Sequence, residues 1–324
     1  MLSPPAALPE ADLADALARC WGLRAASLDY RAVGFGSHHW AVVAADGSRW
    51  FVTVDELVLD DAWGRLTASL SAARALRAAG RDFVVAPVST VDGAAVARLG
   101  RGFAVAVYPH VEGRSFDWGS PVGPVQRDAV LEMVVGVHTA PAEIRCLARV
   151  DDFAVPHLST LDAALDATLD AALEAPAPDA GPYSARVAAL LGSRDAAVRE
   201  LLRRYGDLVA RADPARAVLT HGEPHPGNTM LTAEGWRLID WDTVLVAQPE
   251  RDLWSLDPGD GSLLSAYADA TGVRPLPEML ELFRVRWTLA DIADFVATLS
   301  RPHTGDANDD ATWSYLEATV AGLP

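Results

Sequence analysis

Strands and helices are concentrated in different parts of this 324-residue chain, and that separation limits the folds it can adopt. Short apolar runs joined by turns, with one or two helices between them, fill most of residues 1–107. After Tyr108-Pro109 the apolar spacing becomes mainly helical, apart from an apolar and turn-rich region at 218–242. A strand-rich part followed by a helical part predicts an α+β fold, with domains at 1–107 and 108–324.

Several elements of the first domain can be placed by their turn residues. Asp46-Gly47 between two apolar runs is a strong hairpin signal. Helices are expected over 9–20 and around 66–77, the second ended by Gly80. The strands expected here are 28–33, 39–45, 50–54, 84–88, 94–98 and 103–107.

The charge balance excludes some classes of partner and favours others. The chain has 44 acidic and 27 basic residues, a net charge of -17. This argues against a nucleic-acid surface and suits a cationic small molecule. All 27 basic residues are arginine, so Schiff-base chemistry, pyridoxal phosphate attachment and the P-loop, which need a lysine amine, are excluded.

The two cysteines and the N-terminal residues bear on location. Cys20 and Cys146 have no metal-ligand spacing and indicate a reducing compartment. Residues 1–10 lack the basic and apolar stretches of a signal peptide, and no run approaches 18 apolar residues. We expect a cytoplasmic protein with no membrane partner.

The segment 220–228 reads T-H-G-E-P-H-P-G-N, and W-R-L-I-D-W-D follows at 236–242. The segment has the spacing of a phosphoryl-transfer catalytic loop: a His, one residue, an acid, four residues and an Asn. Glu223 would orient the acceptor hydroxyl and take its proton, Asn228 would bind Mg²⁺ through its amide oxygen, and Asp240 would bridge the metal to the nucleotide phosphates. The alternative is a metal-free loop whose acids cap helices.

These motifs resemble those of the aminoglycoside phosphotransferase family, small-molecule kinases with a protein-kinase-like fold. The family pattern H-G-D-x-H-x-x-N, then I-D-W/F-[DE], is met at 221–228 and 239–242, and residues 249–254 resemble its P-x-x-D-L segment. The resemblance implies two lobes: a strand-rich N-lobe at 1–107 that covers the nucleotide, and a mainly helical C-lobe at 108–324 with the catalytic loop and acceptor pocket. It also implies that Asp252 hydrogen-bonds the loop backbone.

The motif departs from the family pattern at one position and leaves one alternative. Glu223 stands where the family usually has Asp, so its carboxylate reaches about 1.5 Å further. His221 and His225, four residues apart, could bind zinc on a helix, but Pro224 and Pro226 forbid a helix there. In the resembled family these histidines are structural.

The nucleotide contacts are expected in two places. Gly34, Gly36 and Ser37 precede a strand, not a helix, so they resemble the kinase loop over the ATP phosphates and not a Rossmann loop. Tyr108 and His110 resemble by position the hinge that meets the adenine. The alternatives are an ordinary glycine-rich hairpin and a simple interdomain turn.

A lysine is missing from the third strand. Kinase-like folds place a Lys there against the α- and β-phosphates, and Thr53 occupies that position here. Arg49 and Arg74 are candidate replacements by position, although a guanidinium is not equivalent to an ammonium. Because this lysine is missing, the alternative interpretation is a pseudokinase, which is a binding protein that has lost transfer activity.

Acidic and aromatic residues that follow the catalytic loop could contact the acceptor. Asp242 ends the second motif, and Trp287, Asp291 and Asp294 lie in one helical run over 277–299, where Asp291 and Asp294 share a face. Such a pocket would suit an amine-bearing acceptor. The alternative is a solvated acidic face with the tryptophan in the core.

The function predicted is transfer of the terminal phosphate of ATP or GTP, with Mg²⁺, to a hydroxyl of a small molecule. The family resemblance indicates an antibiotic or a related metabolite as acceptor. A metabolite kinase for a sugar or an amino alcohol is an alternative. The pseudokinase is favoured by the missing lysine and opposed by Asn228 and Asp240.

Overall fold

The computed structural model describes residues 1–34, 36–59, 61–171 and 180–324. Within them the chain divides into two compact units, Met1–Asp151 with Asp213–Pro275, and Asp152–Ala212 with Leu276–Pro324. The lobe boundary predicted at residue 107 falls inside strand β5 (Phe103–Pro109) and stays a prediction.

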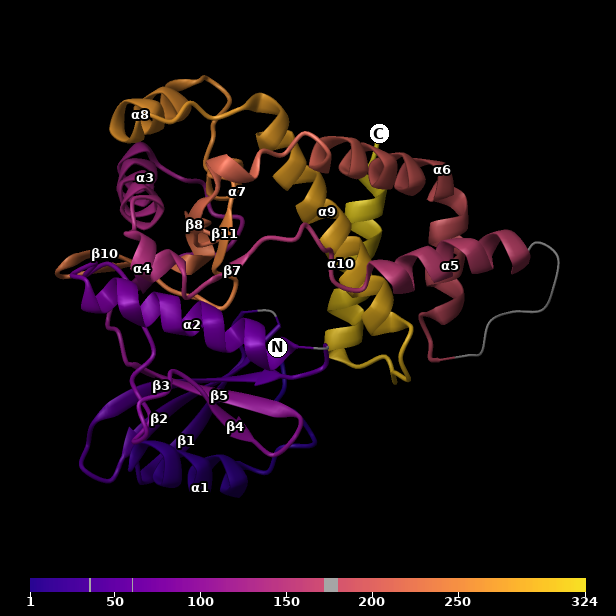
Figure 1. Ribbon diagram of the computed structural model, residues 1–324. Helices are drawn as coiled ribbons and strands as arrows, with labels where there is room; N and C mark the ends of the chain where they lie inside the picture. The colour runs from indigo at the N-terminus through magenta and orange to yellow at the C-terminus, as the bar shows by residue number, and fades with distance from the viewer. Residues whose placement is uncertain (35, 60, 172–179) are drawn as a thin grey trace. The chain divides into compact units, whose positions relative to one another are not determined.

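The first unit contains a five-stranded antiparallel sheet (Figure 1). Its strand order is β1 (Ala25–Arg31), β2 (His38–Ala44), β3 (Arg49–Glu56), β5, β4 (Ala97–Leu99). The hairpin predicted at Asp46-Gly47 is confirmed: Gly47 has φ 85° and its N–H donates to the Ala44 carbonyl at 2.9 Å. The α+β class is confirmed by this sheet and the helices that follow it.

One face of this sheet forms the apolar core of the region with helix α1 (Glu10–Trp21) (Figure 1). Leu13 and Leu17 of α1 are fully buried together with Trp40, Val52 and Val54 of the strands. Since successive strand residues point to opposite faces, the residues between these face away from α1. The polar residues His39, Thr53 and Asp55 therefore share the other face.

The segment 84–88, expected to be a strand, is an extended connection. The Val85 N–H donates to Leu238 and the Val88 N–H to Val107, which belong to different sheets, and Pro87 has no N–H to offer. Only Val84 forms a bridge, with Leu238. The prediction of a strand was wrong because the apolar run hydrogen-bonds first to one sheet and then to another.

Helices and two small sheets complete the first unit. The sheets have the orders β10-β9-β6 and β7-β11-β8. Their strands are β6 (Arg114–Ser115), β7 (Arg149–Val150), β8 (Val218–Thr220), β9 (Thr229–Thr232), β10 (Gly235–Leu238) and β11 (Leu245–Ala247). The helices are α2 (Ala62–Ala78), α3 (Pro124–His138), α4 (Ala142–Arg145), α7 (Glu250–Leu253) and α8 (Ser262–Thr271), with 3-10 turns at Pro214–Arg216 and Pro226–Asn228.

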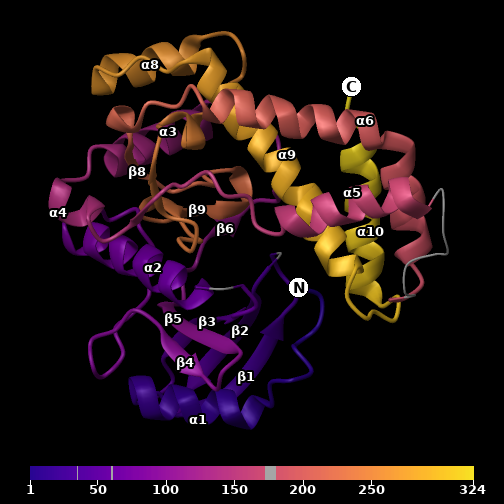
Figure 2. The ribbon, with the colours of Figure 1, turned by 45° about the vertical axis from the view of Figure 1, so that its right-hand side comes forward.

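The second unit is helical (Figure 2). It contains α5 (Leu158–Ala171), α6 (Ser184–Val209), α9 (Pro277–Leu299) and α10 (Ala307–Ala321). Helix α9 has the bounds that the sequence predicted, and its Leu282, Leu289 and Ile292 are fully buried. None of the helices in the described ranges combines the length and the apolar composition that a membrane-spanning helix needs.

Candidate active site

A buried aspartate holds the start of the predicted catalytic loop. Asp252 on α7 is fully buried, and its Oδ2 and Oδ1 accept hydrogen bonds from the backbone N–H groups of His221 at 2.8 Å and Gly222 at 2.6 Å. The His138 Nε2 lies 3.0 Å from Oδ2. Burial by itself raises the pKa of Asp252, but the bond from His138 and the charges of His138 and Arg251 lower it overall. The contact implied by the family resemblance is confirmed, and the carboxylate is ionised.

His221 ties the two halves of the motif together. Its Nε2 donates to the Ile239 carbonyl at 2.9 Å, and its Nδ1 accepts from the Glu223 N–H at 3.2 Å. The ring meets Trp241 edge to face, with centroids 4.6 Å apart. Burial lowers the pKa of His221 to about 4, so the ring is neutral and both nitrogens are used within the protein. The structural role is confirmed, and His221 has no nitrogen left for zinc.

Gly222 allows the loop to pass close to an arginine. Its φ is +106°, and a Cβ there would lie 2.4 Å from Nη2 of Arg251. That guanidinium is held by hydrogen bonds of 2.8 Å to the Thr220 hydroxyl and 2.8 Å to the Thr243 carbonyl. A side chain at this position would therefore displace a bonded group as well as strain the backbone.

We expect Gly222→Ala to reduce the free energy of unfolding by about 2 kcal/mol more than Gly235→Ala. Both positions have a similar positive φ, +106° and +112°, but a Cβ at Gly235 meets nothing within 4 Å. Backbone strain of about 1–3 kcal/mol is therefore common to both variants. Only Gly222→Ala should also break the two Arg251 hydrogen bonds, each worth about 1 kcal/mol. Denaturant unfolding compares the pair, and equal losses would contradict the role given to Arg251.

Glu223 and Asn228 lie together in this loop. The Asn228 Nδ2 donates to the Glu223 carbonyl at 3.0 Å, which leaves the amide oxygen as the end suited to a cation. The Glu223 carboxylate is half-buried, 3.7 Å from Nε2 of His225. Burial raises its pKa, but His225 and then Arg251 lower it overall. An ionised carboxylate in a fixed loop is able to accept a proton.

Asp240 has an uncommon backbone conformation. Its φ is +65°, in the left-handed region, where a residue other than glycine costs about 1–3 kcal/mol and where functional sites are common. The residue as a whole has exposed surface, but its carboxyl group is surrounded by protein atoms. Desolvation by the surrounding protein, followed by the charges of Glu223 and Asp55, raises the pKa of Asp240 to about 6. Burial and the charge of Asp240 raise the pKa of Asp242 well above its usual range.

A further acid, Asp55, joins this group and was missed by the sequence analysis. Its charge raises the pKa values of Asp240 and Asp242, and together with theirs it raises the pKa of the Tyr108 hydroxyl, for which burial is the larger cause. Burial also raises the pKa of Asp55 itself. The spacing on β3 could have revealed Asp55 in the sequence. Asp55 lies two residues after Thr53, and it therefore lies on the same face of the sheet. The sheet thus contributes a carboxylate beside the catalytic loop.

The residue types suit a cation that is shared with a nucleotide. Across the described ranges, no group of three or more His, Cys, Asp or Glu side chains could hold a metal ion by itself. Mg²⁺, however, commonly binds one or two protein oxygens and completes its shell with substrate phosphates and water. The amide of Asn228 and the carboxylate of Asp240 fit that incomplete set.

The residues expected around the nucleotide fall into two places. Gly34 and Gly36, with φ 70° and 91°, lie between β1 and β2. The Ser37 hydroxyl donates to Asp55 Oδ1 at 2.5 Å. At the other end of β3, Nη1 of Arg49 donates to Glu112 at 2.7 Å and Nη2 lies 3.2 Å from Nε2 of His110. Arg49, His110 and the end of β5 with Tyr108 are thus neighbours. Their contact with a nucleotide stays a prediction.

The residues expected around the acceptor are divided. Asp242 belongs to the group of carboxylates beside the catalytic loop. Trp287, Asp291 and Asp294 lie on one face of α9 in the second unit, all half-buried. The Asp294 Oδ1 lies 3.8 Å from Nε2 of His157, and burial raises the pKa of Asp294. Their role toward an acceptor stays a prediction.

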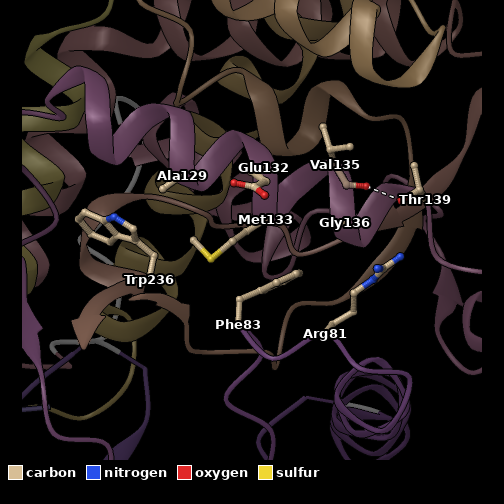
Figure 3. A pocket seen from close by; sticks show the side chains of 9 residues that line it. All are labelled: Arg81, Phe83, Ala129, Glu132, Met133, Val135, Gly136, Thr139 and Trp236. Carbon is tan, nitrogen blue, oxygen red and sulfur yellow. Dashed lines mark hydrogen bonds between the residues drawn. The ribbon is translucent and has the colours of Figure 1, made fainter. Parts of the chain in front are cut away.

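A separate pocket of about 480 Å³ lies against α3 (Figure 3). Met133, Phe83 and Trp236 give it an apolar lining, and Arg81 and Glu132 are the charged residues that line it. None of the predicted site residues lines it. The residues of this pocket are therefore different from those of the carboxylate group beside the catalytic loop.

Comparisons with known proteins agree with the motifs and the fold. StrN of Streptomyces griseus is 33% identical over 245 residues, 74% of this chain and 72% of that protein. The crystal structure of spectinomycin phosphotransferase APH(9)-Ia with ADP and spectinomycin has a TM-score of 0.71 at 17% identity, covering 96% of each chain. Macrolide 2'-phosphotransferase MphH from Brachybacterium faecium has a TM-score of 0.52 at 21% identity, covering 97% of this chain and 98% of that one. These structural likenesses establish the kinase-like fold.

The family itself follows from the sequence match. The model of the phosphotransferase enzyme family, APH, matches residues 29–283, which include the glycine turn, β3 and the whole catalytic loop. The predicted resemblance is thereby confirmed: the chain belongs to the APH phosphotransferase enzyme family and is a small-molecule kinase.

Proposed function

We propose that this chain transfers the terminal phosphate of ATP or GTP to a hydroxyl of a small molecule, in a Mg²⁺-dependent reaction. The observation that carries the proposal is the ionised Glu223 carboxylate in a loop fixed by Asp252 and His221, with Asn228 and Asp240 beside it. The strand-rich lobe at 1–107 would cover the nucleotide through Gly34, Gly36 and Ser37. Tyr108, His110 and Arg49 would lie toward its base.

In this reaction the oxygen of the acceptor hydroxyl forms a bond to the terminal phosphorus, and Glu223 accepts the proton of that hydroxyl. The bond from that phosphorus to the bridging oxygen breaks, and the nucleoside diphosphate leaves with the electron pair. Asn228 and Asp240 would hold Mg²⁺, which when bound neutralises the charge on the phosphates. The side chain of Glu223 is one methylene longer than the Asp of the family, so its carboxylate reaches about 1.5 Å further from the backbone.

The acceptor we propose is an amine-bearing antibiotic or a related metabolite. The net charge of -17 and the acidic residues Asp242, Asp291 and Asp294 favour a cation, and Trp287 offers an aromatic face. The structural neighbours include a spectinomycin phosphotransferase and an amicoumacin kinase crystallised with AMP-PNP and Ca²⁺. The same charge disfavours nucleic acid as a partner.

A transfer assay tests this proposal. The purified chain is incubated with ATP or GTP labelled in the terminal phosphate, with and without Mg²⁺, and with a panel of hydroxylated antibiotics, sugars and amino alcohols. We expect labelled product from an amine-bearing antibiotic only with Mg²⁺. Transfer to a sugar or amino alcohol alone would favour the metabolite kinase. A Mg²⁺-dependent thermal shift with nucleotide but no product in any arm would favour the pseudokinase.

We expect Asp240→Asn to raise the Mg²⁺ concentration needed for nucleotide binding by at least about 10-fold, because it removes the charge of a cation ligand while keeping its size. The measurement is the nucleotide-dependent shift in melting temperature, titrated with Mg²⁺. Asp128→Asn on the exposed side of α3 is the matched control and should leave the midpoint unchanged. An unchanged midpoint for Asp240→Asn would remove Asp240 from the cation site.

A further inference from the structure

The sheet face beside the carboxylates lacks the cation that a kinase-like fold usually carries on its third strand. Thr53 occupies that position, and the chain contains no lysine. Asp55, on the same face, adds a negative charge. A nucleotide triphosphate brought to this face would therefore need positive or hydrogen-bond-donating groups from neighbouring strands.

The register of the sheet places two such groups in one row with Thr53. His39 on β2 pairs with Thr53 on β3, and Arg31 on β1 pairs with His39. Paired residues of antiparallel strands share a face, with Cβ atoms about 4.5–5.5 Å apart. Leu28 and Tyr30 of β1 pack into the α1 core, so Arg31 faces the other way, as His39 and Thr53 do.

The His39 ring is oriented toward the glycine turn. Its Nδ1 lies 3.3 Å from the Thr53 hydroxyl, and a Cβ built on Gly34 would lie 3.2 Å from its Nε2. The ring stacks on Phe51, with centroids 5.2 Å apart and planes at 26°. When the Thr53 hydroxyl donates to Nδ1, the ring proton is on Nε2, directed at the turn that in kinase-like folds covers the phosphates.

Arg31 is the last residue of β1 and lies three residues before Gly34. Its side chain is 53% exposed, and its contact with Asp29 is long, at 3.9 Å. A guanidinium in this position can extend across the row toward His39. Arg49 contrasts with it, because it lies at the opposite end of β3 and is bonded to Glu112 at 2.7 Å.

We infer that Arg31 and His39 bind the phosphates of the nucleotide in the place left by the third-strand lysine. This inference rests on the proposed function. Arg31 supplies the charge, through a guanidinium that can bind a phosphate with two hydrogen bonds. His39 supplies an N–H donor held by its stacking on Phe51. Burial, then the N-terminal ammonium and His38, lowers the pKa of His39 to about 4, so it donates as a neutral ring and leaves the charge to Arg31.

Binding measurements on three variants test this inference. Arg31→Gln removes the charge from an exposed side chain, and His39→Phe keeps a stacking ring without its N–H donor. Arg24→Gln, at the exposed position just before the other end of β1, is the matched control. Isothermal titration compares the affinities for the nucleoside diphosphate that the wild type binds and for the corresponding nucleoside, in the presence of Mg²⁺.

We expect Arg31→Gln and His39→Phe each to weaken diphosphate binding by about 10-fold or more, since each removes a hydrogen bond to a charged group. Nucleoside affinity should stay within about 2-fold, and Arg24→Gln should change neither value. Diphosphate affinity at the wild-type level in both variants, or equal losses for diphosphate and nucleoside, would overturn the inference. If the wild-type protein transfers phosphate, either of these results would overturn the inference and leave the proposed function intact. If the wild-type protein binds no nucleotide, the inference and the proposed function are both overturned.

Discussion

Glu223→Gln is expected to lower phosphate transfer by about 10²–10⁴-fold while leaving the affinity for Mg²⁺-nucleotide near the wild-type value. The substitution keeps the size of the side chain and removes its ability to accept a proton. Because phosphoryl transfer depends mainly on positioning and electrostatics, the loss should be toward the low end of that range. The readout is the rate of transfer to the acceptor found in the panel, together with nucleotide affinity from titration.

The loop itself should survive this change. Glu223 is tied into the loop by its backbone, whose N–H donates to His221 Nδ1 and whose carbonyl accepts from Asn228 Nδ2. Glu223→Asp asks whether the site needs the longer side chain, and partial activity is expected because the family usually has Asp here. Glu234→Gln in the exposed β9–β10 turn is the control. Transfer at the wild-type rate by Glu223→Gln would show that another group takes the proton.

The catalytic loop was predictable because its chemistry is local in the sequence. The spacing from His221 to Asn228 carries the positions of the acid and the amide, and the prolines exclude a helix. The family resemblance pointed to Asp252, and the two backbone bonds to its carboxylate confirm that contact. The positive φ of Asp240 had no sequence signal, since the residue is not a glycine.

Asp55 and the row through Thr53 could not be predicted in the same way. Their surroundings depend on which residues of three strands face one another, and a register shift of one residue would move all of them to the other face. The prediction of a strand at 84–88 was wrong for a related reason, because residues of this segment hydrogen-bond to two different sheets. Helix α9, in contrast, follows from periodicity within a single run, and its bounds agree with the prediction.

The largest effect on stability is expected from Asp252→Asn, which should reduce the free energy of unfolding by about 3–5 kcal/mol. Both carboxylate oxygens accept hydrogen bonds from buried N–H groups, those of His221 and Gly222, and one also faces His138. An amide has only one oxygen, so its NH₂ group would face a buried donor. The residue is fully buried, and no water can replace the lost acceptor without opening the loop.

The pH dependence of this variant separates the effect of the lost charge from the effect of an amide NH₂ group that faces a buried donor. The pKa of Asp252 is lowered in the folded protein, so its stabilising contribution is fully present above the pKa of an unfolded aspartate, about 3.9, and is lost as the pH falls through the lower folded value. Denaturant unfolding between pH 7 and pH 3 should therefore show the Asp252→Asn deficit shrinking toward acid pH. Asp128→Asn should stay within about 0.5 kcal/mol of wild type at neutral pH. A deficit that is the same at every pH would mean that the negative charge of Asp252 is not what stabilises the loop.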